Sequence, residues 1–265
     1  MYSLGWLSTG RDEAARQLLA TVQDAIQKGE SKAQIAFVFS NREPGENQES
    51  DRFFDLVREY RIPLVCLSSN RFRASQAGTE WRPAYEREAM QRLGAYRPDL
   101  CVLAGYMLIV GEEMCRRYPM INLHPAAPGG PTGTWQEVIW KLIEARARET
   151  GVMMHRVTPE LDRGPVATYC TFPIRGQPFD KHWHDIEDMS VEEIKREQGE
   201  DNALFRLIRS HGVARELPLI LATLKAFSEG KLRFQGYGVV NSPGQPIHGH
   251  DLTEEIEATL RHGVV

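Results

Sequence analysis

Short apolar runs alternate with amphipathic segments through the first two thirds of the chain. Continuous or alternating apolar residues are typical of strands, whereas apolar residues spaced three or four apart are typical of helices. The predicted strands are 2–8, 33–41, 63–69, 100–110, 120–124 and two within 151–174, and the predicted helices are 12–30, 49–60, 82–96 and 134–149. Strands that alternate with helices favour an α/β fold with a mostly parallel sheet flanked by helices.

The expected position of a ligand site follows from this fold class, because ligands of such sheets bind outside the carboxyl ends of the strands. The loops of interest are those that follow residues 7, 40, 68, 105, 124 and 157.

The pattern changes in the last third of the chain, which turns polar and acidic at about residue 176. Ser190 and Glu193 have the spacing of a helix capping box, which predicts a short helix there. Residues 201–234 are strongly helical and should pack on the sheet. We therefore expect one domain over 1–234 and a C-terminal appendage with a short acidic helix over 235–265.

The composition narrows the class of protein. The 265 residues are 42% hydrophobic and 26% charged, as in ordinary globular proteins, and the net charge of −4 comes without a basic block, which argues against nucleic-acid binding. No apolar run approaches the roughly 20 residues of a membrane span, and the N-terminus lacks the pattern of a signal peptide. We expect a cytoplasmic protein that does not bind membranes.

The cysteines and clustered histidines give no metal signature. The four cysteines are widely spaced, which favours reduced thiols over disulfides or a zinc site. The segments KHWHD (181–185) and HGHD (248–251) each pair two histidines with an aspartate, but neither has a third ligand group nearby in sequence. We expect no metal.

Asn122 and His124 are the first candidates for chemistry. They lie two residues apart at the carboxyl end of a predicted strand, so both side chains point to one face and into the expected ligand crevice. An isolated pair of this kind can equally be a turn-forming amide and a structural histidine. The turn 158–166 adds Asp162, and a carboxylate that bonds an imidazole fixes its tautomer and stabilises its protonated form.

Together the amide, imidazole and carboxylate suit acyl transfer without a covalent enzyme intermediate. The amide N–H can donate to a developing oxyanion, and no serine or cysteine lies in a nucleophile elbow.

Three motifs occur in a specific order: LAGYMLIV (103–110), INLHPA (121–126) and G-x-x-x-H-x-V-x-x-E-L-D-x-G-P-V (151–166). With them the chain resembles the folate-dependent formyltransferase family, and in particular its purine-synthesis members, over residues 2–234. The resemblance is strongest over 99–173. It implies a Rossmann-like fold and 10-formyltetrahydrofolate as the formyl donor and co-substrate.

The resemblance also implies roles for individual residues. Asn122 would hold the formyl oxygen, and His124 would stabilise the tetrahedral oxyanion and take part in proton transfer. Asp162 would orient His124 and help move a proton off the attacking amine through water, with His155 as a supporting residue. The folate pterin pocket would be lined by Tyr106, Met107, Leu108, Ile109, Val110, Thr158 and Glu160. Arg71 or Arg73 would meet the folate glutamate tail or lie in a plain surface loop.

The substrate side departs from the family pattern. The glycine-rich loop that holds the substrate phosphate is reduced here to Ser8, Thr9 and Gly10, followed by Arg11. These four are the expected phosphate residues, since a helix N-terminus and an arginine both attract an anion. Asp12 and Glu13 would repel it unless they serve the helix dipole.

Three further positions differ from the family. Leu108 replaces an arginine, Val213 replaces a glutamate that binds the substrate ribose, and AAPGGPTGTW (126–135) replaces the usual loop after the histidine. The chemical trio is thus kept while the substrate side has changed.

We therefore predict formyl transfer from 10-formyltetrahydrofolate to a primary amine, with glycinamide ribonucleotide of purine biosynthesis as the expected acceptor. The alternatives are another amine such as an amino sugar nucleotide, hydrolysis of the folate with water as acceptor, and a non-catalytic folate- or nucleotide-binding protein. The expected partners are small molecules, and the expected state is a monomer or homodimer.

Overall fold

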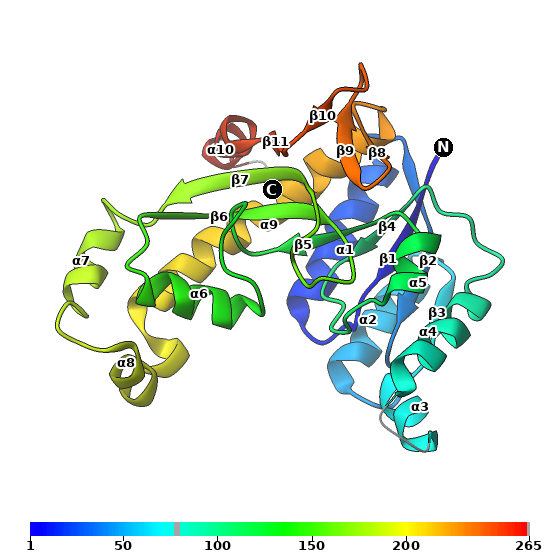
Figure 1. Ribbon diagram of the computed structural model, residues 1–265, viewed down its shortest axis with the longest axis horizontal. Coiled ribbons are helices and arrows are strands. Elements are labelled where there is room, and N and C mark those ends of the chain that lie inside the picture. Colours follow the sequence, from blue (N-terminus) through cyan, green and yellow to red (C-terminus); the bar gives the residue numbers. More distant parts are fainter. Residues whose placement is uncertain (77–79, 264–265) are drawn as a thin grey trace.

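The computed structural model of the chain describes residues 1–76 and 80–263, over which an eight-stranded sheet is flanked by helices and a three-stranded sheet lies beside it (Figure 1). The strand order in the larger sheet is β11-β7-β6-β5-β4-β1-β2-β3. The strands are β1 (Tyr2–Leu7), β2 (Ala33–Ser40), β3 (Leu64–Cys66), β4 (Leu100–Leu103), β5 (Met120–His124), β6 (Glu149–Arg156), β7 (Val166–Pro173), β8 (Leu232–Gln235), β9 (Gly238–Asn241), β10 (Pro246–Ile247) and β11 (His250–Asp251).

The larger sheet is mixed but mostly parallel. Only β5–β6 and β6–β7 are antiparallel among the strand pairs of this sheet in the described residues. The expected α/β fold with a mostly parallel sheet flanked by helices is therefore confirmed. The chain runs outward from β1 to β3 and then returns to β4 on the other side of β1. The carboxyl ends of β1 and β4 thus form the switch point at which sheets of this kind bind ligands.

The helices begin where side chains satisfy their first N–H groups. The Asp12 carboxylate accepts from the N–H of Ala15 at the start of α1, and Thr134 and Ser190 form capping boxes for α6 and α8, the latter as predicted. The helical segments are α1 (Glu13–Gln27), α2 (Gln48–Glu59), α3 (Ser69–Ser75), α4 (Trp81–Arg92), α5 (Glu112–Arg117), α6 (Trp135–Glu144), α7 (Phe179–His184), α8 (Val191–Glu197), η1 (Gly199–Asp201), α9 (Ala203–Ser228) and α10 (Thr253–Arg261).

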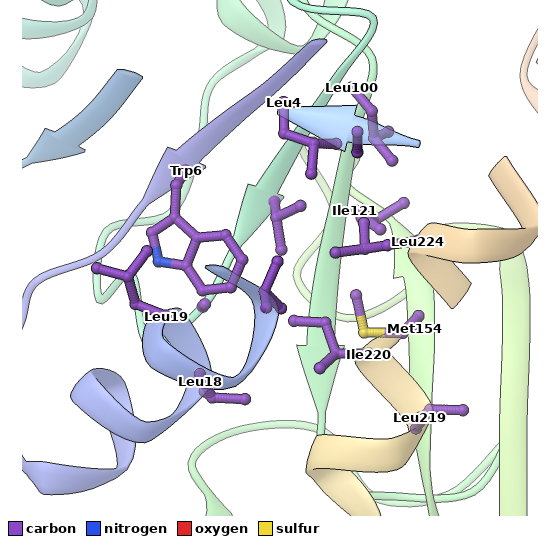
Figure 2. Close-up of a cluster of buried hydrophobic side chains, with 14 of the residues drawn as sticks. Leu4, Trp6, Leu18, Leu19, Leu100, Ile121, Met154, Leu219, Ile220 and Leu224 are labelled. Carbon is purple, nitrogen blue, oxygen red and sulfur yellow. The ribbon is translucent and has the colours of Figure 1, made fainter. Parts of the chain in front are cut away.

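Alternate residues of the central strands pack on opposite faces of the sheet. Leu4 and Trp6 of β1 belong to the core shared with α1 and α9, whereas Leu7 belongs to the core shared with α4. Figure 2 shows Ile121 of β5 beside Leu224 of α9 in the first of these cores. Burying each such side chain stabilises the fold by about 1.5–3 kcal/mol.

Helix α9 connects two parts of the core. Leu204 and Phe205 in its first half pack with α6, α7 and α8, while Leu219 and Leu224 in its second half pack on the sheet. The helix therefore fixes the antiparallel end of the sheet relative to α6. Although α9 has 26 residues, no helix within the described ranges is long and apolar enough to cross a membrane.

Several predicted elements end earlier than the sequence indicated, and the two largest differences concern 100–110 and 201–234. The strand predicted over 100–110 stops at Leu103, because Gly105 with φ +69° turns the chain away from the sheet. Met107 and Ile109 are then 45% and 43% exposed, whereas Ala104 and Val110 of the same run are buried in the core. The helix predicted through residue 234 stops at Ser228, before a turn at Gly230 and strand β8.

Three short helices were missed, namely α3, α5 and α7. Residues 69–73, interpreted as a loop, belong to α3, whose first turn is capped by Ser68. Helix α7 lies in the polar segment after residue 176, where Phe179 and Trp183 are buried. Each carries too few apolar residues to show a helical period in the sequence.

The segment after residue 234 packs on the rest of the chain. Strand β11 pairs in parallel with β7, and the buried Leu252 and Ile256 belong to the same core as α9. Arg215 of α9 pairs with Glu257 of α10 at 2.5 Å. The domain boundary between residues 234 and 235 stays a prediction, but the described part of the segment contributes to the core.

If this segment is part of the cooperative fold, Ile256→Ala should lower the free energy of unfolding by about 2–4 kcal/mol, because it leaves a cavity against α9. Glu255→Ala, an exposed neighbour on the same helix, serves as the control and should cost under about 0.5 kcal/mol. Urea unfolding measures both. Equal, small effects would mean that α10 is an independent appendage.

Candidate active site

Asn122 and His124 lie on the face of β5 opposite to Ile121 and Leu123, whose side chains pack against the α9 core. The antiparallel register places Asn122 directly across from His155 of β6. The Asn122 amide Nδ2 donates to His155 Nε2 at 3.2 Å. The amide of the predicted trio is therefore held by the histidine that was expected to support it.

The hydrogen bonds of the two imidazoles define their neutral tautomers. His155 donates from Nδ1 to the carbonyl of Arg156 at 3.0 Å, which leaves Nε2 as the acceptor for Asn122. His124, only 2% exposed, donates from Nε2 to the carbonyl of Pro131 at 2.9 Å. Its Nδ1 then carries the lone pair and faces Asp162.

The Asp162 carboxylate lies between the two imidazoles. Oδ2 is 3.6 Å from His124 Nδ1, and Oδ1 is 3.6 Å from His155 Nε2. Oδ2 also accepts from the N–H of Gly133 at 3.1 Å. The side chain is 5% exposed, so one buried carboxylate joins β5, β6 and the loop before α6.

The turn that carries Asp162 depends on local backbone geometry. Asp162 has φ +54°, a left-handed conformation that aspartate and asparagine tolerate better than most residues. A Cβ atom on Gly164 would lie 1.8 Å from the carbonyl oxygen of Arg156, so only glycine fits there. The sequence D-x-G-P thus folds back onto the end of β6.

Burial and hydrogen bonding act in opposite directions on Asp162. Burial by itself raises the pKa of this carboxyl, but the imidazoles of His155 and His124 and the Gly133 N–H together lower it below its ordinary value. For His124, burial lowers the pKa of the imidazole and outweighs the opposing effects of the Pro131 carbonyl and Asp162. At neutral pH the site therefore holds a neutral imidazole beside an ionised carboxylate.

Asn122, His124 and Asp162 line a cavity of about 330 Å³. Its walls come from the segments after β1, β4 and β5, the start of α6, the turn at Asp162 and one face of α9. A smaller cavity of about 50 Å³ adjoins it and shares Asn122 and Asp162. The position at the carboxyl ends of β1, β4 and β5 is the one that the topology predicts.

The predicted folate residues fall into three groups. Tyr106, Met107, Leu108 and Ile109 line the larger cavity, and Val110 and Thr158 line the smaller one. Glu160 is exposed and lines neither, although its carbonyl accepts from the Thr158 hydroxyl at 3.1 Å. Leu161, which sequence reasoning had not singled out, is 50% exposed and lines both cavities.

The predicted phosphate residues are mostly used inside the protein. Thr9 Oγ1 donates to Asn41 Oδ1 at 2.7 Å and accepts from the Met107 N–H, and Ser8 Oγ accepts from the Gly10 N–H. None of Ser8, Thr9 and Gly10 lines the larger cavity, whereas Arg11 does. Ser8, Thr9 and Gly10 therefore shape the loop after β1 rather than face a ligand.

Other candidates lie away from these cavities. Arg71 belongs to α3 and pairs with Glu43 and Glu46, and neither it nor Arg73 lines either cavity. Val213 is likewise not part of the cavity wall. Across residues 1–76 and 80–263, no group of three or more histidine, cysteine, aspartate or glutamate side chains is placed to hold a metal ion.

Sequence reasoning missed several residues of the larger cavity, among them Trp135 at the start of α6 and Arg209 and Glu216 on α9. Arg209 and Glu216 lie seven residues apart, which places them on one face of the helix two turns from each other. That spacing alone does not distinguish a cavity wall from a solvated face, so the signal was too weak to find them.

Residues 13–178 match the family model described as formyl transferase. This match covers more than half of the chain, so the protein belongs to the formyl transferase family, a family of folate-dependent enzymes, and the resemblance noted in the sequence is confirmed.

Relatives and solved structures agree with this assignment. The chain is 29% identical to the phosphoribosylglycinamide formyltransferase of Escherichia coli over 163 residues, which cover 59% of this chain and 68% of that protein. It is 26% identical to the Haemophilus influenzae enzyme of the same name, over 82% of this chain and 84% of that protein.

A solved structure of phosphoribosylglycinamide formyltransferase from Coxiella burnetii has a TM-score of 0.68 at 23% identity, covering 94% of this chain and 98% of that one. A formyltetrahydrofolate deformylase from Pseudomonas syringae has a TM-score of 0.62 at 20% identity, covering 91% of this chain and 65% of that one. Both likenesses show the shared fold.

The pair His124–Asp162 gives a testable pH dependence. Because the folded-state pKa of His124 is lowered, the ring should stay neutral at pH 7 and take up a proton only below its ordinary range. Its contribution to stability is then present above about pH 6.5 and is lost as the pH falls through the lowered pKa. Histidine-resolved NMR titration measures the pKa of His124 directly.

Asp162→Asn should lower the pKa of His124 further, because it removes the carboxylate that favours the imidazolium. Glu144→Gln, an exposed carboxylate on α6, is the control and should leave the titration unchanged. A His124 pKa that rises in Asp162→Asn would contradict this electrostatic arrangement.

Proposed function

We propose that the chain transfers a formyl group from 10-formyltetrahydrofolate to a primary amine, with glycinamide ribonucleotide as the acceptor. The observation that carries the proposal is the contact series Asn122–His155–Asp162–His124, in which Asn122, Asp162 and His124 line the larger cavity and His155 lines the smaller one beside it. It combines a hydrogen-bond donor for an oxyanion, a neutral imidazole and an ionised carboxylate within reach of one substrate.

In this reaction the neutral amine nitrogen attacks the formyl carbon, and negative charge develops on the formyl oxygen. The bond from the carbon to N10 of the folate then breaks, and the proton lost by the amine ends on N10. One N–H of the Asn122 amide donates to His155, so the other N–H can donate to the formyl oxygen. Asp162 stays ionised and stabilises the imidazolium when His124 takes a proton.

His124 needs a change of partner to act on the formyl oxygen. Its Nε2–H is bonded to the Pro131 carbonyl at 2.9 Å, so the substrate must replace that carbonyl. Pro131 belongs to the loop between β5 and α6, in which Gly129 and Gly133 have positive φ. We propose that this loop adjusts when both substrates bind, which exchanges one hydrogen bond for another.

The folate fits the apolar side of the cavity. Met107, Ile109 and Leu161 are three of the five large hydrophobic side chains that are exposed in the described part of the chain. All three line the larger cavity. An aromatic ring of the co-substrate would cover them, and the backbone groups of residues 106–110 would contact the pterin, as proposed from the resemblance.

Two findings bear on the identity of the acceptor. The names of the E. coli and H. influenzae relatives support glycinamide ribonucleotide and a place in purine biosynthesis. The likeness to a deformylase structure makes water the second acceptor to test. A cytoplasmic location and a monomeric or homodimeric state stay predictions.

The first test is an initial-rate assay of the purified protein with 10-formyltetrahydrofolate and glycinamide ribonucleotide. We expect loss of the formyl donor that depends on the acceptor, with formylated product. Formate release without any acceptor would instead identify a hydrolase. Binding of the folate without turnover on glycinamide ribonucleotide, an amino sugar nucleotide or water would identify a binding protein.

The second test removes the proposed catalytic groups. His124→Ala and Asp162→Asn should each lower kcat by about 10²–10⁴-fold, the usual contribution of a positioned acid or base. Asparagine tolerates the positive φ of residue 162, so the fold should be kept, which circular dichroism checks. His248→Ala, at an exposed histidine, should keep the normal rate. Near-normal rates in either site variant would refute these roles.

A further inference from the structure

Negatively charged side chains outnumber positively charged ones in the wall of the larger cavity. Four carboxylates and two guanidinium groups line it, namely Asp12, Glu137, Asp162, Glu216, Arg11 and Arg209. These carboxylates repel an anion that enters the cavity unless a cation lies directly beside it. An acceptor that carries a carboxylate or phosphate must therefore place that group against one of the two arginines.

The first arginine lies where the resemblance predicts a phosphate site, but the protein itself supplies an anion there. Asp12 Oδ1 accepts from the Ala15 N–H at 3.0 Å, and Asp12 Oδ2 pairs with Arg11 Nε at 3.2 Å. One carboxylate thus caps α1 and neutralises both features that would attract a phosphate, the helix N-terminus and Arg11.

The second arginine is held in a fixed position. Arg209 Nη1 donates to Glu216 Oε1 at 2.6 Å, and the guanidinium carbon lies 4.7 Å from the centre of the Trp135 ring. Seven residues of helix span about 10 Å, so the Arg209 side chain is extended along α9 to reach Glu216. A carboxylate at one end and an indole face on one side therefore restrict this guanidinium before any ligand binds.

Arg209 still has donors to offer. A guanidinium has five N–H groups in a planar fork, and the bond to Glu216 is the one side-chain hydrogen bond that Arg209 makes to the described residues. The Arg209 side chain is 22% exposed and lines the cavity, whereas that of Glu216 is 10% exposed. A planar fork of this kind suits two-point binding of a carboxylate or phosphate.

We propose that Arg209 recognises an anionic group, a carboxylate or a phosphate, on the formyl acceptor, and that Glu216 and Trp135 position it. This inference rests on the proposed formyl transfer and assigns the acceptor to the class of anionic amines. It moves recognition of the anion from the loop after β1 to α9, the helix whose Val213 stands where the family resemblance places a ribose-binding glutamate.

The test compares Arg209→Met with Glu216→Gln. Methionine keeps an aliphatic chain against Trp135 but removes the charge. With the acceptor that the wild type uses, we expect Arg209→Met to raise KM for the acceptor about tenfold or more, with kcat within about twofold. Glu216→Gln keeps an acceptor oxygen and removes a competing negative charge, so KM should stay the same or fall.

The opposite responses separate recognition from packing. A merely structural ion pair would be weakened by both substitutions, so an equal rise in KM in the two variants would overturn the proposal. A change of less than twofold in Arg209→Met would also overturn it, as would a loss confined to Arg11→Met. Arg206→Met is the matched control, because Arg206 lies one turn earlier on α9, exposed and paired with Asp201.

An equilibrium measurement keeps this inference apart from the proposed reaction. Tryptophan fluorescence of the wild type is titrated with ribose 5-phosphate and with succinate, and Trp135 beside Arg209 is the expected reporter. Binding of either anion that Arg209→Met weakens about tenfold supports the proposal even if no formyl transfer is found, and it distinguishes phosphate from carboxylate. A wild type that binds neither anion would overturn it.

Discussion

The placement of one buried carboxylate holds the site together. Asp162 lies 3.6 Å from each of two imidazoles and accepts the N–H of Gly133, so the contacts of a single side chain connect β5, β6 and the loop before α6. Burying an ionised carboxylate is costly unless a donor faces it, and the Gly133 N–H is such a donor. The arrangement therefore constrains its surroundings: the turn must adopt φ +54° at Asp162, and Gly164 must lack a side chain.

Helix α9 gives that site its second wall. Its apolar residues join the core of the parallel sheet to the core beneath α6, and the same helix carries Arg209 and Glu216 into the cavity. Asn122, His124 and His155 come from strands and Asp162 comes from the turn after β6, while the charged residues of α9 approach from the other side. Because the two groups lie on different elements, residues that contact the acceptor can change without moving Asn122, His124 or Asp162. The loop after β1 and the segment 126–135 depart from the family pattern in this way.

The sequence predicted the parts of the site that depend on local spacing. Asn122 and His124 could be placed at a strand end because a two-residue spacing selects one face, and the order of motifs linked them to Asp162. Arg209, Glu216 and Trp135 could not be found, since their meeting depends on how α9 packs against α6. The strand predicted over 100–110 was too long because Met107 and Ile109, which line the larger cavity, cannot be distinguished in the sequence from core residues. Ser8 and Thr9 matched a motif, yet their hydroxyls bond Gly10 and Asn41 instead of facing the cavity.

The direction of the two pKa shifts decides where a proton can reside. The pKa of Asp162 is lowered from an ordinary value near 4, so this carboxyl is ionised at neutral pH, and the pKa of His124 is lowered from an ordinary value near 6.5, so the imidazole is neutral. In the proposed reaction, a proton from the attacking amine would be held on His124, and the charged Asp162 would stabilise it. The neutral His124 presents the lone pair of Nδ1 to a carboxylate oxygen 3.6 Å away, an unfavourable contact that protonation of Nδ1 would convert into an ion pair. The position of Asp162 thus favours the imidazolium form of His124, whereas burial of the ring opposes it.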